Sequence, residues 1–386
     1  AVARGDEQPD LLLHNARIVN VFTREIEHGS IAIADGRIAC IGERLERGAQ
    51  TIDMEGSFVC PGFLDAHMHV ESTMLVPSEF ARLAVPHGTT GVVLDPHEIA
   101  NVQGIEGIRF LMTNAEGLPL RCFFGASSCV PSSPLEHAGA ELSADDLAPL
   151  FDEPSIVALA EMMNYPGVVN ADPGVLEKVA LGLERAIVDG HCPGLRGRAL
   201  QAYIAAGISS DHESFTLDEA REKLARGMHV HIREGSAARN LKALSTLITP
   251  ELADKVSFCT DDRHPADLRE DGHINNILRR AVGLGVDPVT AIVCATRSTA
   301  QHYGLTGLGA IAPGYHADLV ILDDLESFMP THVVCAGELV ARGGEYLGSS
   351  KFIAGYPPSP VTLPEDLDAT SLRIPAPESG ARIRVI

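Results

Sequence analysis

Residues 60–71 have the sequence CPGFLDAHMHVE, and this segment indicates how the rest of the chain is organised. Pro61-Gly62 interrupts an apolar run, and a short buried strand then resumes and ends in His67 and His69. Side chains two residues apart on a strand lie on the same face, so both imidazoles are expected to point toward one cation. A His-x-His pair is a weak signal alone, and it gains weight from further histidines and carboxylates at the ends of later strands.

From residue 60 to residue 306, apolar strand-like segments alternate with helical ones. The expected strand ends are, in chain order, His69, Asp95 to Glu98, Ser127-Ser128, Glu161, His191, His212, His231 to Glu234, and Asp261-Asp262. Eight such repeats over about 250 residues match the size of a (β/α)8 barrel, whose chemistry gathers at the C-terminal ends of its strands. We therefore predict an α/β fold with a (β/α)8 TIM-type barrel over residues 60–306.

The flanking segments have short strands and tight turns instead. Residues 29–42 predict a β-hairpin with Asp35-Gly36 at its turn. We expect residues 1–59 and 307–347 to form one small β-sandwich domain, built from both flanks of the barrel. Residues 348–386 are rich in Pro and Ser and are expected to be a linker or strap that leads to a missing C-terminal domain.

Composition excludes several classes of partner. A formal net charge of −22 disfavours binding to a nucleic-acid backbone, although it does not disfavour an uncharged nucleobase. The sequence has no apolar run of about 18 residues, so no membrane partner is expected, and its start lacks the apolar segment of a signal peptide. Eight cysteines without a Cys-x-x-Cys pair indicate reduced thiols in a cytoplasmic protein.

Six imidazole and carboxylate groups are candidates to line one cavity: His67, His69, Glu161, His191, His212 and Asp261. Such donors without thiolate suit zinc, iron or manganese. A carboxylate at the position of Glu161 can bridge two cations, and two metals about 3.5–4 Å apart can hold one hydroxide between them. Asp261 would bind metal and handle the proton of that water, with Glu234 or Asp262 as a second acid.

Each candidate also has a structural interpretation. His191 and His212 would serve as helix-capping or loop residues, and Glu161 as a carboxylate paired with arginine. Another group, Asp95, His97, Glu98 and His231, forms either an additional metal or substrate site or, for the first three, the turn and cap of the next helix. His229 and His231 are a rival His-x-His pair that is less expected to bind the metal directly, and His231 or Glu234 is expected to reach substrate. The joint placement of the six groups at strand ends favours the metal site.

Several motifs support a resemblance to known proteins. His67-x-His69 after Pro-Gly-Phe-Leu-Asp, and the turn at residues 314–318, resemble the metal-dependent amidohydrolase superfamily. Within it, the chain resembles the bacterial adenine deaminases in the blocks at residues 69–73, 95–102, 161–167, 190–194, 210–213 and 260–263. The resemblance implies that His67, His69, His191, His212 and Asp261 bind two divalent metal ions (Mn, Fe or Zn). Glu161 would then take the bridging place that a carboxylated lysine holds in many relatives, and an added site would lie near residues 95–98.

The activity that this resemblance implies is hydrolytic deamination of adenine to hypoxanthine and ammonia by a metal-bridging hydroxide, in purine salvage. Asp261, Glu161, Glu234 and Asp262 would be its catalytic residues. Adenine is the expected small-molecule partner, and we expect a homo-oligomer. The alternatives are another amidohydrolase, acting on a cyclic amide or a different aminopurine, and an inactive, metal-free relative with a binding role. Adenine deaminases of this type continue past the equivalent of Ile386, so we expect the chain to be truncated.

Overall fold

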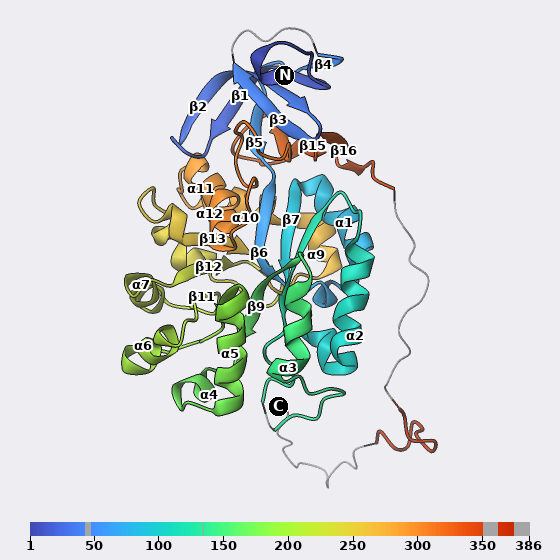
Figure 1. Cartoon of the computed structure of the whole chain (residues 1–386), viewed down its shortest axis with the longest axis vertical. Helices are drawn as coiled ribbons and strands as arrows, with labels where there is room; N and C mark the ends of the chain where they lie inside the picture. Colours follow the sequence, from blue (N-terminus) through green and yellow to red (C-terminus); the bar gives the residue numbers. More distant parts are fainter. Residues whose placement is uncertain (43–47, 134, 350–361, 374–386) are drawn as a thin grey trace, which may run out of the picture.

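A computed structural model describes residues 1–42, 48–133, 135–349 and 362–373. It combines a large sheet, at the top of Figure 1, with alternating parallel strands and helices below it. The strands are β1 (Leu11–Asn20), β2 (Glu25–Ala34), β3 (Arg37–Gly42), β4 (Gln50–Asp53), β5 (Phe58–Pro61), β6 (Phe63–Met68), β7 (Thr89–Leu94), β8 (Arg121–Ala126), β9 (Ile156–Met162), β10 (Ile187–Gly190), β11 (Ser210–Asp211), β12 (His229–Arg233), β13 (Val256–Cys259), β14 (Leu319–Leu322), β15 (Pro330–Cys335), β16 (Glu338–Arg342) and β17 (Glu345–Tyr346).

The helices follow mainly between the strands from β6 onward. They are α1 (Pro77–Ala84), α2 (His97–Ala115), α3 (Ala144–Leu147), α4 (Tyr165–Val169), α5 (Pro173–Arg185), α6 (Gly197–Ala205), α7 (Leu217–Ala225), α8 (Leu241–Leu244), α9 (Pro265–Asp271), α10 (Ile274–Gly283), α11 (Pro288–Cys294) and α12 (Arg297–His302). Short 3-10 helices span Val2–Arg4, Glu71–Thr73, Val85–His87, Ala148–Asp152, Ser245–Leu247 and Ala253–Lys255.

Both ends of the described chain contribute to the large sheet. Its nine strands run in the order β17-β16-β15-β14-β5-β1-β2-β3, with β4 paired to β1. The two halves meet where β14 pairs antiparallel with β5, with Leu319 opposite Pro61. Because β5 ends at Pro61, this sheet extends two residues past the boundary expected at residue 59. Apolar side chains of β1, β2 and β14 form its core, which buries Leu13, Ile31 and Leu319.

The hairpin expected at residues 29–42 is present as β2 and β3, joined by the two residues Asp35 and Gly36. Both have positive φ, 50° and 69°, which is the backbone that a tight type I′ turn requires. Gly36 is also approached by the Ala336 carbonyl oxygen, which would lie 2.7 Å from an added Cβ. Glycine therefore allows this turn to pack closely against the C-terminal half of the sheet.

Eight parallel strands make up the rest of the framework. Five form a sheet in the order β10-β9-β8-β7-β6 and three form a sheet in the order β11-β12-β13. Parallel bridges connect the two sheets at both sides, between Val188 and Ile208 and between Met68 and Asp261. All residues of β6, β7, β12 and β13 are buried, as expected for parallel strands covered by helices.

Local signals in the sequence set where several of the covering helices begin. Asp172, Thr216 and Asp287 each precede a helix and accept a hydrogen bond from a backbone N–H of its first turn, at the start of α5, α7 and α11. These contacts satisfy amides that have no partner inside the helix. The helices return the chain to the start of each next strand, so the strand C-terminal ends all lie at one end of the framework.

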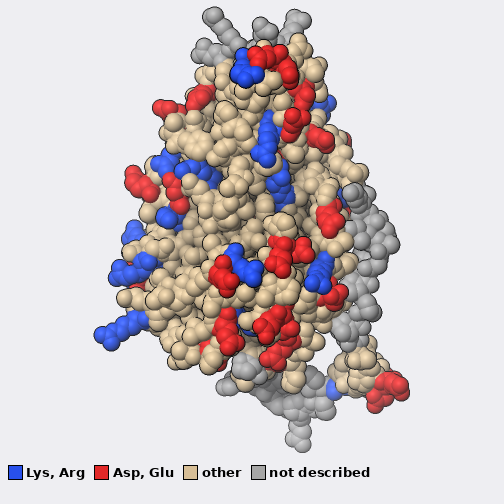
Figure 2. Space-filling view, in the orientation of Figure 1, with Lys and Arg blue, Asp and Glu red and all other residues tan. Residues whose placement is uncertain are grey.

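The strap expected over residues 348–386 lies mostly outside the described residues. Its described parts, residues 348–349 and 362–373, contain bends and turns without a helix or strand. On the face drawn in Figure 2, acidic and basic side chains are interspersed. None of the helices in the described part of the chain combines the length and apolar character needed to cross a membrane.

Candidate metal centre

The histidine pair converges as the alternation of a strand predicts. His67 is in β6 and His69 follows its end, and their Nε2 atoms lie 3.2 Å apart. His69 Nδ1 lies 2.8 Å from the Asp95 carbonyl oxygen, which can only accept a hydrogen bond. Nδ1 must therefore carry the proton, and the lone pair of His69 Nε2 is left to face the cluster. A contact of this kind orients imidazole ligands in metal sites.

Glu161, at the end of β9, is the centre of the group. Its Oε2 lies 2.6 Å from His191 Nδ1 and 3.2 Å from His212 Nε2. Its Oε1 lies 3.3 Å from His69 Nε2 and 3.8 Å from His67 Nε2. The two oxygens thus face two different pairs of histidines. The carboxylate is 2% exposed, so no bulk water competes for these contacts.

Asp261 joins the group through an unusual backbone. It has φ of 58°, a left-handed conformation that side-chain-bearing residues rarely adopt. Its amide donates to the His67 carbonyl at 3.0 Å, and its carbonyl accepts from the His69 amide at 3.1 Å. Its carboxylate then lies 3.5 Å from both His69 Nε2 and His212 Nε2. Strained backbone of this kind is concentrated at functional sites.

The pKa of each ionisable side chain in this group depends on its charged neighbours. Burial opposes ionisation of Glu161, but hydrogen bonds from His191 and His212 outweigh it and hold its pKa well below the usual range. Burial disfavours protonation of His212, yet Glu161 and Asp261 raise its pKa to about 9. Burial raises the pKa of Asp261 to about 6. The cavity thus favours positive charge next to its carboxylates, as a cation-binding site must.

A second layer of polar groups lies beside His69. The Asp95 carboxylate accepts from Ser127 Oγ at 2.8 Å and lies 3.1 Å from His97 Nδ1. His97 Nδ1 is also 3.4 Å from Glu161 Oε1, and Glu98 Oε2 is 3.5 Å from His69 Nδ1. One donor atom each from His69, Asp95, His97 and Glu161 lies within 4.8 Å of the others. The structure therefore brings three of the four additional candidates to the main group.

The remaining sequence candidates contact other groups than the six expected metal ligands. Asp262 accepts from Ser72 Oγ at 2.5 Å and lies 3.1 Å from Arg233 Nη2. The carboxylate of Glu234 lies 3.0 Å from Arg280 Nη1. His231, the fourth additional candidate, belongs to a separate cluster with Asp189 and His302.

Two buried cations near the centre are absent from the sequence prediction. Arg233 Nη1 lies 2.7 Å from Asp261 Oδ2, and the same guanidinium also pairs with Glu213. The sequence signal for Arg233 was the continued alternation His229-x-His231-x-Arg233, which places all three side chains on one face of β12. Lys223 lies 2.9 Å from the Asp211 carboxylate, next to His212, but its position in α7 gave no comparable signal.

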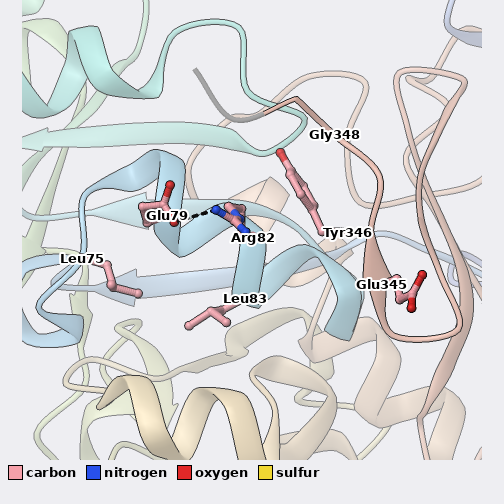
Figure 3. A pocket seen from close by; sticks show the side chains of 7 residues that line it. All are labelled: Leu75, Glu79, Arg82, Leu83, Glu345, Tyr346 and Gly348. Atoms are coloured by element: carbon pink, nitrogen blue, oxygen red, sulfur yellow. Dashed lines mark hydrogen bonds and ion pairs between the residues drawn. The ribbon is translucent and has the colours of Figure 1, made fainter. Parts of the chain in front are cut away.

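A surface cavity of about 610 Å³ lies apart from this centre, between α1 and β17. Figure 3 shows its lining, in which Glu79 and Arg82 form an ion pair 3.2 Å long beside Tyr346. Neither a histidine nor any of the six expected metal ligands lines this cavity. It is therefore not the candidate metal centre.

Comparison with known proteins identifies a family and several relatives. Residues 58–340 match the amidohydrolase family. The chain is 46% identical to an adenine deaminase of Desulfatibacillum aliphaticivorans, over 100% of this chain and 67% of the relative. It is 47% identical to one from Nitratidesulfovibrio vulgaris, with 99% and 66% covered, and 49% identical to one from Kosmotoga olearia, with 89% and 60% covered. The chain thus spans about two thirds or less of the length of these curated relatives.

Solved structures share the fold at low sequence identity. A β-aspartyl dipeptidase from Fervidobacterium islandicum superposes with a TM-score of 0.66 at 16% identity, over 89% of this chain and 99% of that one. An L-hydantoinase from Arthrobacter aurescens gives 0.64 at 15%, with 88% and 98% covered. These likenesses establish the α/β fold with parallel strands and carry no information on substrate.

Proposed function

Since the chain belongs to the amidohydrolase family, among the relatives of the adenine deaminases, we propose that it deaminates adenine hydrolytically to hypoxanthine and ammonia. The observation that carries this proposal is 46–49% identity to three adenine deaminases over most of the chain. The convergence of His67, His69, Glu161, His191, His212 and Asp261 supports it, because hydrolysis of the exocyclic C6–N bond requires an activated water.

The family is metal-dependent, and the donor set here fits two divalent cations, Mn, Fe or Zn. Three arguments support two ions. Glu161 directs each of its oxygens at a different pair of histidines. Asp261 has one oxygen near His69 and the other near His212. Imidazole and carboxylate donors within 3.2–3.5 Å of one another are close to the separations found between ligands of one ion.

Such ions, when bound, would polarise water and lower its pKa toward neutrality. The residues of this chain position and move protons. Water gains a bond to C6 of adenine and gives up a proton, which Asp261 is placed to accept. The neighbouring ring nitrogen takes up that proton, and the second proton of the water, released as the C6 hydroxyl becomes a carbonyl, goes to the amine, so that the C6–N bond breaks and ammonia leaves. Arg233, 2.7 Å from Asp261, holds this carboxylate in place.

Asp262 is the better candidate for a second acid. Its carboxylate shares Arg233 with Asp261, so it lies at the same end of the strands as the metal centre. Glu234 remains a weaker candidate because Arg280 holds its carboxylate. We assign Asp95, His97 and Glu98 to an additional metal or substrate site beside His69.

Finer features of the architecture follow from the same framework. We propose that the eight parallel strands form a (β/α)8 barrel over residues 60–306, supported by the bridges at Met68 and Val188. The nine-stranded sheet from residues 1–59 and 307–347 would be the small β-sandwich.

We also propose a cytoplasmic homo-oligomer. The location is supported by eight unpaired cysteines, and the assembly is testable by light scattering.

The decisive experiment follows adenine by ultraviolet absorbance after loading the chain separately with manganese, iron and zinc. Conversion to hypoxanthine with release of one ammonia is expected with at least one metal and none after chelation. A panel containing a cyclic amide and other aminopurines runs in parallel. Turnover of the cyclic amide without turnover of adenine would overturn the proposal. Absence of tightly held metal would indicate an inactive relative instead.

A further inference from the structure

A second cluster of donors lies inside the framework and shares no residue with the metal centre. It consists of Asp189 from β10, His231 from β12 and His302 from the end of α12. One donor atom from each lies within 4.8 Å of the other two. Asp189 and His231 are 4% and 1% exposed, and the His302 side chain is 8% exposed. The proposed deamination uses none of these residues.

His231 is the unusual member of this cluster. Both of its ring nitrogens are buried and neither has a hydrogen-bond partner among the residues that the structure describes. A buried polar group without a hydrogen bond is energetically costly and requires an explanation. The neighbouring His229 differs, because its Nε2 lies 2.7 Å from Ser257 Oγ. The ring nitrogens of His231 are therefore available to a ligand that the described residues do not supply.

One separation within the cluster is close to that between two ligands of one metal ion. His302 Nε2 lies 3.2 Å from Asp189 Oδ1. Two ligands bound at about 2.0–2.2 Å in a tetrahedral site lie roughly 3.3–3.6 Å apart. Burial and the nearby His302 lower the pKa of His231 to about 3, so its ring stays neutral, as a metal ligand must be. Ser210 Oγ donates to Asp189 Oδ1 at 2.6 Å and the Tyr303 hydroxyl lies 2.8 Å from Oδ2, which fixes the carboxylate.

Access comes from the opposite end of the strands. A cavity of about 680 Å³ is lined by His302 and Tyr303 and by the first residues of β8, β9 and β10, which are Arg121, Ile156 and Ile187. The metal centre lies at the C-terminal ends of the same strands. An ion could therefore reach the cluster without passing through the proposed active site.

We propose that Asp189, His231 and His302 form an additional binding site for a divalent transition-metal cation. Two imidazoles and one carboxylate are a donor set that zinc and ferrous iron both accept. A fourth position would be open toward the cavity and available to water. The ion would tie β10, β12 and α12 together, and its role is structural because the proposed deamination uses none of its three ligands.

The test counts zinc per chain by mass spectrometry after loading and gel filtration. His302→Gln and His231→Gln are each expected to lose one equivalent relative to the unmutated chain. The matched control is His316→Gln, which changes a histidine on the wall of the same cavity outside the donor set and should keep full zinc. Equal zinc in the unmutated chain and both cluster variants would overturn the proposal. This readout is independent of whether adenine is the substrate.

A second measurement covers variants that do not fold. Crystals of the unmutated, zinc-loaded chain are measured on both sides of the zinc absorption edge. An anomalous peak between the three side chains supports the site. A water molecule bonded to His231 at that position, without an anomalous signal, explains the unsatisfied nitrogens in another way and overturns the proposal.

Discussion

Lys223 offers the sharpest test of how the metal centre is supported. The residue is fully buried, and its ammonium lies 2.9 Å from Asp211 Oδ2 and 2.8 Å from Glu219 Oε1. It also donates to the Cys192 carbonyl at 2.9 Å. Asp211 and Cys192 directly precede and follow the proposed ligands His212 and His191 in the chain. We predict that Lys223→Met destabilises the fold and weakens metal binding together.

The size of this loss of stability follows from the charges that remain after the substitution. Methionine fills similar space but leaves Asp211 and Glu219, which are 0% and 5% exposed, without their cation. Removing one partner of a buried ion pair costs about 3–5 kcal/mol. At about 2.1 cal/mol/K per residue, the unfolding entropy of 386 residues is roughly 0.8 kcal/mol/K. The melting midpoint should therefore fall by about 4–6 °C.

Differential scanning calorimetry on the zinc-loaded protein measures this shift. The control is Arg196→Met, which removes a cation from an exposed pair between the residue that precedes α6 and Glu222 of α7, the helix that carries Lys223. Water screens that pair, so the control midpoint should stay close to that of the unmutated chain. Equal midpoints for the two variants would refute the view that Lys223 compensates two buried carboxylates. Unchanged zinc affinity in Lys223→Met would refute the coupling to the metal centre.

Three further predictions concern the centre itself. Glu161→Gln should lose metal affinity and deamination activity together, each by more than the roughly 10–100-fold that is typical of a lost supporting contact. Normal metal content and turnover in this variant would exclude a bridging role for Glu161. Arg233→Lys should lower kcat at least about 10-fold while metal content stays near normal, because an ammonium cannot reproduce the guanidinium contacts to Asp261 and Asp262. Steady-state kinetics together with metal analysis tests this prediction. An unchanged kcat would contradict it. Chelation should abolish activity. When the free metal concentration is 100 times its Kd, removing each ion should also lower the free energy of unfolding by about 2.7 kcal/mol and the melting midpoint by roughly 3 °C. A chelated protein with an unchanged melting midpoint would contradict tight binding.

Much of the framework was predictable because the signals are local. Apolar segments ending in polar residues predicted the parallel strands, and Asp35-Gly36 predicted the hairpin between β2 and β3. His67 and His69 were predictable as a pair because a strand repeats every two residues. The same rule would have added Arg233, which follows His231 by two positions on β12.

The sequence by itself determined which donors exist and at which strand ends they stand, since alternation and turn chemistry act over a few residues. Only the tertiary structure decided which of them meet. It turned Asp261 into a left-handed conformation that places its carboxylate between His69 and His212. It also separated His231 from Asp95 and placed it beside His302, 71 positions later in the chain. Distances between residues far apart in sequence depend on how strands close and helices pack, and no local pattern encodes them.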